Sequence, residues 1–177
     1  MKLGRVGPKT PFFRAFTPKW AYEPESGDGA ALVGGRFNRP GLKARYLAES
    51  LDAALREYQQ TSSLLPPATV ASFLVSAEPV VDFTGGYLES EWSEIWQEAY
   101  CSWRDLAYVQ KVDPPSWIIG DIVVASGAAG LLYRSALDHR SVCLVLYPDN
   151  SRAFSAPVHD PYAALPADQS SWPKSRS

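Results

Sequence analysis

The chain carries, at residues 34–41, the run Gly34-Gly35-Arg36-Phe37-Asn38-Arg39-Pro40-Gly41. Two glycines before an arginine and a Pro-Gly pair after it are typical of a compact turn, in which backbone amides can come close to a ligand. A guanidinium presented by such a turn can bind phosphate through paired hydrogen bonds. The run therefore predicts a loop that offers Arg36 to an anion.

A strand and a helix are expected directly after this loop. Residues 44–48 predict a short strand that carries Tyr46, bounded by Gly41 and Ser50. Ser50 is a residue type that caps helices, and the spacing after it predicts a helix over residues 51–60. The apolar face of this helix is expected to contain Leu51, Ala54, Leu55 and Tyr58. Glu57 falls at the edge of that face, where a carboxylate can border a cleft.

The three side chains together suit an anionic substrate that contains a flat ring and a glycosidic bond. The guanidinium of Arg36 can hold a phosphate, and the ring of Tyr46 can stack on a heterocycle. The carboxylate of Glu57 can stabilise an oxocarbenium-like transition state. If Tyr46 acts by stacking alone, a phenylalanine at that position should preserve much of the activity.

The remaining patterns predict an α+β fold with a small mixed or antiparallel sheet flanked by helices. Residues 1–11 are expected to form a flexible arm, and residues 161–177 a surface tail rich in proline, alanine and serine. With no internal repeat or linker, residues 1–177 are expected to form one domain with a core at about 12–157. Further strands are expected at residues 12–16, 69–75, 79–83, 130–135 and 141–147, and a further helix at 89–105. The apolar run at 116–126 fits either a buried helix or a strand, and its length favours the helix.

The segment 89–105 has two competing interpretations. Trp92, Trp96 and Trp103 recur with Ala99 at helical spacing, which favours a helix whose apolar face packs in the core. The alternative is a non-catalytic protein-binding module that uses this tryptophan-rich helix to grip a partner.

Composition and missing motifs exclude several function classes. The chain is 46% hydrophobic and 20% charged with a net charge of −2, so it lacks the basic footprint of nucleic-acid binding. It has no signal-like or membrane-spanning run, which predicts a cytoplasmic protein. Cys101 and Cys143 stand 42 positions apart without metal-ligand companions, so no metal site is expected. Phosphate-binding, dinucleotide-binding and hydrolase motifs are also lacking.

Taken together, the motifs resemble the RES domain, which is named for its Arg, Glu and Ser. The resemblance rests on the run at residues 34–41, on Tyr46-Leu47-Ala48-x-Ser50, and on Ala54-Leu55-x-Glu57. Residues 130–136 resemble the segment that supplies the family's serine, which places that serine at Ser135. The resemblance covers roughly residues 12–150.

This resemblance implies a bacterial toxin of an Xre–RES type toxin–antitoxin pair, with a fold similar to ADP-ribosyltransferase toxins. Such enzymes use NAD⁺ as substrate, with no further cofactor, and cleave the bond between nicotinamide and ribose. The acceptor of the ADP-ribose can be a protein target, water or phosphate. The implied partner is a cognate Xre antitoxin that covers the cleft near Arg36.

The resemblance also implies roles for individual residues. Arg36 would hold the pyrophosphate or ribose, and Tyr46 would stack on the nicotinamide ring. Glu57 would bind the ribose hydroxyls and stabilise positive charge at the anomeric carbon. Ser135 would add a polar contact on the nicotinamide-ribose side, and Arg14 is a further candidate for a phosphate contact.

Overall fold

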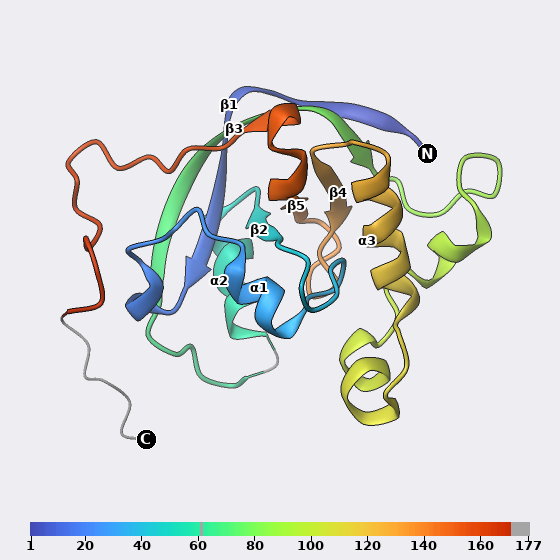
Figure 1. Cartoon of the computed structure of the whole chain (residues 1–177), viewed down its shortest axis with the longest axis horizontal. Coiled ribbons are helices and arrows are strands. Elements are labelled where there is room, and N and C mark those ends of the chain that lie inside the picture. The colour runs from blue at the N-terminus through green and yellow to red at the C-terminus, as the bar shows by residue number, and fades with distance from the viewer. Residues whose placement is uncertain (61, 171–177) are drawn as a thin grey trace.

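A strongly curved sheet forms the framework of the molecule. The computed structural model describes residues 1–60 and 62–170, and within them six strands follow the order β1-β2-β5-β4-β3-β6. Strand β1 also pairs with β3, so the sheet curls back on itself. Figure 1 shows β1 and β3 as a long arc beside the shorter strands. The strands are β1 (Leu3–Phe16), β2 (Arg45–Ala48), β3 (Thr69–Asp82), β4 (Gly130–Arg134), β5 (Val142–Leu146) and β6 (Phe154–Ser155).

Short helices cover this sheet and connect its strands. The helices are α1 (Asp28–Val33), α2 (Leu51–Gln59), α3 (Pro115–Ala125), the 3-10 turns η1 (Pro18–Trp20), η2 (Glu94–Glu98) and η4 (Pro148–Ala153), and the π-helical η3 (Asp105–Gln110). As expected, Ser50 caps α2, because its hydroxyl accepts a hydrogen bond from Ala53 N at 3.1 Å. In Figure 1, α1 and α2 lie together on one side of the molecule, and α3 lies on the other. The α+β class predicted from the sequence is confirmed.

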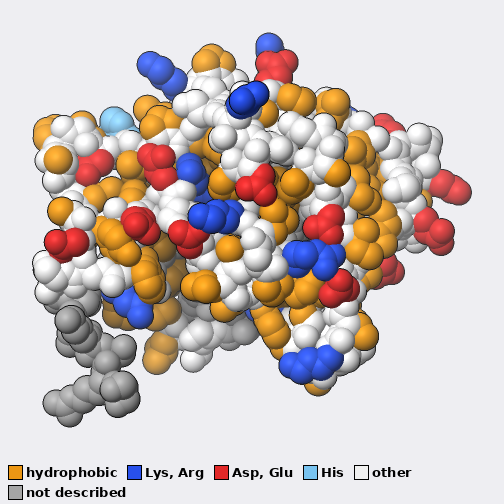
Figure 2. All heavy atoms as spheres, in the orientation of Figure 1, with side chains coloured by type: hydrophobic (Ala, Val, Ile, Leu, Met, Phe, Trp, Pro, Cys, Tyr) orange, Lys and Arg blue, Asp and Glu red, His pale blue; other side chains and the backbone are white. Residues whose placement is uncertain are grey.

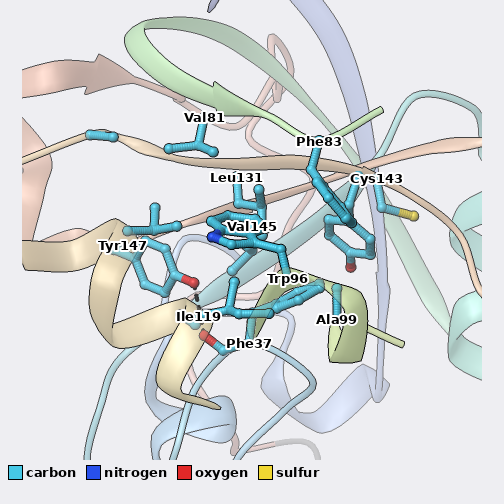
Figure 3. Packing of buried hydrophobic residues seen from close by; sticks show 14 of the residues in the cluster. Phe37, Val81, Phe83, Trp96, Ala99, Ile119, Leu131, Cys143, Val145 and Tyr147 are labelled. Carbon is cyan, nitrogen blue, oxygen red and sulfur yellow. Dashed lines mark hydrogen bonds between the residues drawn. The ribbon is translucent and has the colours of Figure 1, made fainter. Parts of the chain in front are cut away.

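Alternate residues of the central strands enter two separate hydrophobic clusters, as the pleat of a strand requires. Ala48 of β2 and Val145 of β5 belong to a cluster that includes α3 and the tryptophan segment. Leu47 and Leu144, their neighbours in sequence, belong to the cluster beneath the β1–β3 arc. Figure 3 shows the first cluster, in which aromatic rings from several segments surround the strands. Tyr46 lies on the face of this first cluster, so the same face carries the candidate site.

The expectation of a flexible arm at residues 1–11 is wrong for residues 3–11. These residues extend β1 and pair antiparallel with β3, from Leu3 opposite Val81 onward. Residues 3–11 are ordered because they pair with β3, a strand far away in sequence, and their own composition does not reveal this partner. Of the expected tail, residues 161–170 are mostly exposed turns, and residues 171–177 lie outside the described residues. The two strands expected at 69–75 and 79–83 are one strand, β3.

The expectation of a helix over residues 89–105 is also wrong. Only η2 and residues 103–105 are helical there, because the chain turns repeatedly around Phe83. The rings of Trp92 and Trp96 lie 4.9 and 5.0 Å from the Phe83 ring, centroid to centroid. Both tryptophans and Trp103 are buried. Core packing of the tryptophans is confirmed, and the protein-binding alternative loses the exposed aromatic face on which it depends.

The exterior offers no basic stripe in the view of Figure 2, where lysines and arginines are interspersed with acidic and apolar side chains. Within residues 1–60 and 62–170, no helix combines the length and apolar character needed to cross a membrane. The helix expected at 116–126 is present as α3.

Candidate active site

A cleft of about 470 Å³ opens on the sheet face that carries Tyr46. This volume is within the range of small-molecule and cofactor sites. Four of the five residues predicted from the sequence line it, namely Arg14, Arg36, Tyr46 and Glu57. Its other lining residues include Phe13, Tyr58, Trp103, Arg104, Tyr133, Leu137 and Cys143. Residues separated by about 130 positions therefore meet in one depression.

The loop that carries Arg36 is held rigidly by its surroundings. Trp117 of α3 donates from its indole Nε1 to Gly35 O at 2.8 Å, and the Tyr147 hydroxyl donates to Phe37 O at 2.8 Å. Figure 3 shows the second of these bonds at the edge of the core. A Cβ at Gly120 of α3 would lie 2.0 Å from Phe37 O, so glycine there lets the helix approach the loop. The predicted turn is therefore preorganised by tertiary contacts.

Asn38 supplies the internal bracing of the same loop. Its buried amide Nδ2 donates to three backbone carbonyls, those of Ala30, Arg39 and Leu42, at 2.9 to 3.2 Å. The backbone of Gly35 donates to Asn38 O at 2.9 Å. Gly34 has φ of +74°, in the region that favours glycine. The glycines and the asparagine of the motif thus shape the loop, while the arginine is free to project from it.

Tyr46 has a structural role that the sequence did not predict. Its hydroxyl accepts a hydrogen bond from Phe37 N at 3.0 Å and donates one to Asn38 Oδ1 at 2.8 Å. Burial raises the pKa of this hydroxyl above its ordinary value, so it stays protonated and able to donate. A Cβ at Gly35 would lie 2.5 Å from the same oxygen. Tyr46 therefore supports the Arg36 loop with its hydroxyl while its side chain lines the cleft.

Glu57 projects from α2 into the cleft and is held by Ser135. The Ser135 hydroxyl donates to Glu57 Oε1 at 2.5 Å and accepts from the backbone N of Leu137 and Asp138 at 3.0 and 3.2 Å. Those two amides fix the direction of the hydroxyl, because Ser135 is 2% exposed. The α2 residues that are buried are Ala53 and Ala54, whereas Leu51, expected on the apolar face, is exposed. Small alanines let α2 approach the sheet, which brings Glu57 over the cleft.

Ser135 itself does not line the cleft. It lies behind Glu57 and contacts the carboxylate rather than the open volume. Cys143 lies on the same side, with its sulfur 3.9 Å from Glu57 Oε1. Burial, reinforced by the Glu57 carboxylate, raises the pKa of the Cys143 thiol, which keeps it neutral. The serine is thus placed to orient the glutamate.

The cleft contains three arginines. Arg14 donates from Nη1 to the carbonyls of Pro24 and Ser26 at 2.9 and 2.8 Å, and burial next to Arg45 lowers its pKa to about 10. Arg36 donates to Cys101 O at 3.1 Å. Arg104 is exposed and was missed by the sequence analysis, in which its segment was read only for its tryptophans. The sequence signal for this residue was an arginine directly after Trp103, but no local pattern indicates that this pair lines the same cleft as Arg36.

The charge of the cleft contrasts with that of the chain. The net charge of the chain is −2, yet the cleft presents these three arginines and one carboxylate, Glu57. None of the four forms an ion pair within the part of the chain that the structure describes. Residues 1–60 and 62–170 contain no group of three or more His, Cys, Asp or Glu that could hold a metal ion. Such a set of charges can bind an anionic group beside a carboxylate.

An α+β domain with an arginine loop, a tyrosine and a serine-bound glutamate around one cleft has the residue set expected of a RES domain. The chain belongs to this family, because the RES domain model matches residues 11–168. The resemblance predicted from the motifs is therefore confirmed. No curated protein matches the chain in sequence.

Among solved structures, the fold is similar to a chain in the crystal structure of the M. tuberculosis MbcT-MbcA toxin-antitoxin complex. The match has a TM-score of 0.56 and 22% sequence identity, and covers 89% of this chain and 85% of the other. At this level of identity the similarity establishes the fold alone.

Proposed function

We propose that this protein is the toxin of a toxin–antitoxin pair and that it consumes NAD⁺ in the cytoplasm. The reaction cleaves the nicotinamide–ribose bond and passes ADP-ribose to an acceptor, which is a protein, water or phosphate. The observation that carries the proposal is the Glu57 carboxylate, held by buried Ser135 in a cleft shared with Arg36 and Tyr46. Membership of the RES domain family supports the same assignment.

The residues of the cleft account for each step of this chemistry. Arg36 binds the diphosphate through charge-assisted hydrogen bonds, and the Tyr46 ring packs against the nicotinamide. The bond between the ribose C1′ and the nicotinamide nitrogen breaks, and its electron pair leaves with the nicotinamide, which becomes neutral. Glu57 stabilises the positive charge that develops at C1′. The acceptor oxygen then attacks C1′ and releases its proton.

A toxin of this kind requires a partner that silences it. The structural neighbour comes from a toxin–antitoxin complex, which supports a cognate antitoxin for this chain. We propose that this antitoxin is of the Xre type and covers the cleft near Arg36. Induced expression of this chain in bacteria should arrest growth and lower cellular NAD⁺, and coexpression of the antitoxin should restore both. Normal growth with undiminished NAD⁺ in cells that accumulate the folded protein would refute the toxin role.

The chemistry is tested most directly by Glu57→Gln, assayed by nicotinamide release from NAD⁺. The amide retains an oxygen that can accept the Ser135 hydrogen bond, so we expect the free energy of unfolding to stay within about 0.5 kcal/mol of the wild type. The rate should fall by roughly two to three orders of magnitude, because the charge opposite C1′ is lost. Glu91→Gln, which changes an exposed glutamate outside the cleft, is the matched control.

The outcome of this pair decides the role of Glu57. A folded Glu57→Gln protein with full activity would remove Glu57 from the mechanism.

The acceptor is identified separately by incubating the wild-type protein with labelled NAD⁺ and cell extract. Label on a discrete protein band identifies protein ADP-ribosylation, whereas free ADP-ribose or its 1″-phosphate identifies water or phosphate as the acceptor.

A further inference from the structure

Two arginines from distant segments line the same cleft. Arg36 projects from the loop before β2, and Arg104 directly precedes η3. Arg36 Nη1 donates to Cys101 O at 3.1 Å, which ties the Arg36 side chain to the segment that continues into Arg104. Both side chains therefore line one cleft, and Arg36 is bonded to the segment that leads to Arg104.

Aromatic rings orient both guanidinium groups without neutralising their charge. The Arg36 guanidinium carbon lies 5.7 Å from the centroid of the Tyr100 ring, and that of Arg104 lies 4.3 Å from the Trp103 ring. A guanidinium that stacks on a ring keeps its in-plane donors available for a ligand. Within the described residues, the ion pairs of the chain use other cations, namely Arg39, Lys43, Arg56 and Arg140.

The closeness of the two cations has an electrostatic consequence. Partial desolvation of the guanidinium, followed by the neighbouring charge of Arg36, lowers the pKa of Arg104 below its ordinary value. Two like charges that face one cavity repel each other, and an anion between them removes that repulsion. The Glu57 carboxylate lines the same cleft and acts in the opposite direction on the pKa of Arg104; it repels anions and attracts a cationic group.

We infer that Arg104 is a second substrate-binding residue, which together with Arg36 holds the diphosphate of a dinucleotide whose cationic nicotinamide end faces Glu57. This inference rests on the proposed function, and it names a residue that confers specificity for substrates with a diphosphate. The cleft is positive at the arginines and negative at Glu57, and NAD⁺ carries the opposite charges on its diphosphate and its nicotinamide. A substrate that lacks the diphosphate gains nothing from Arg104.

The test compares Arg104→Ala with Arg5→Ala, which removes an exposed arginine outside the cleft. Nicotinamide release is measured with NAD⁺ and with nicotinamide riboside, which has the same glycosidic bond but no diphosphate. For Arg104→Ala we expect KM for NAD⁺ to rise about 10- to 100-fold, as loss of a charge-assisted contact predicts, with no change for the riboside. Arg104→Lys should recover only part of the loss, because lysine keeps the charge but not the planar donors.

Titration of inorganic pyrophosphate into the wild type, Arg104→Ala and Arg5→Ala separates this inference from the proposed function. Affinity should fall only in Arg104→Ala, and its melting temperature should match the wild type because Arg104 is exposed. The wild type could release no nicotinamide and yet bind pyrophosphate more tightly than Arg104→Ala does. That result would refute the proposed NAD⁺ reaction but support Arg104 as an anion-binding residue. Wild-type KM and pyrophosphate affinity in folded Arg104→Ala, or equal losses on both substrates, would overturn the role of Arg104.

Discussion

Removing one oxygen atom, in Tyr46→Phe, tests whether the tyrosine acts mainly through its ring or through its hydroxyl. The hydroxyl makes hydrogen bonds of 3.0 Å with Phe37 N and 2.8 Å with Asn38 Oδ1. Both Phe37 and Asn38 are fully buried, so water cannot replace the lost partner. A buried polar group left without a partner costs about 1–3 kcal/mol.

Two such groups predict a loss of about 2–6 kcal/mol in the free energy of unfolding. For a domain of this length, that loss lowers the melting temperature by roughly 4–24 °C. Nicotinamide release should also fall, because the loop that presents Arg36 loses its support from β2. This expectation differs from the one drawn from the sequence, in which stacking alone made phenylalanine an adequate replacement.

Thermal unfolding and nicotinamide release are measured on the same preparations of Tyr46→Phe and of a control, Tyr162→Phe. Tyr162 is 89% exposed, so loss of its hydroxyl should leave both quantities unchanged. If Tyr46→Phe melts with the wild type and keeps its activity, the two hydrogen bonds do not support the loop and the ring alone is sufficient. Reduced activity at unchanged stability would instead mean that the hydroxyl acts on the substrate.

Two further substitutions examine the supports of the site. Gly35→Ala places a Cβ 2.5 Å from the Tyr46 hydroxyl and 2.6 Å from Asn38 Oδ1, so the unfolding free energy measured in urea should fall by about 1–3 kcal/mol. An unchanged urea midpoint would show that the loop can move aside. Ser135→Ala removes the hydroxyl that orients Glu57 and satisfies two backbone amides; stability should fall by about 1–2 kcal/mol, and nicotinamide release by about tenfold in the protein that remains folded. Full activity of the folded Ser135→Ala protein would show that Glu57 is oriented without the serine.

The elements that have local signals could be predicted from the sequence. The glycines around Arg36 require a turn because a side chain would clash there or adopt an unfavourable φ, as at Gly34 and Gly35. The cap at Ser50 begins α2, and the apolar run after two prolines forms α3. Because these signals act within a few residues, they predicted the loop, the strand and the helix that carry Arg36, Tyr46 and Glu57.

Contacts between distant segments set how these elements are arranged and which residues complete the cleft. Residues 3–11 form a strand because β3 pairs with them, and the tryptophan segment is broken because its rings pack around Phe83. Arg104 reaches the cleft because that broken segment folds against the Arg36 loop. Strand pairing and side-chain packing join residues that are far apart in sequence. The free energy of these contacts therefore cannot be predicted from the pattern of residues in any one segment. Motifs along the chain could therefore identify the residues of the proposed chemistry, Ser135 among them. They could not reveal the hydrogen bonds of the Tyr46 hydroxyl, the contact between the serine and Glu57, or the place of Arg104 in the cleft.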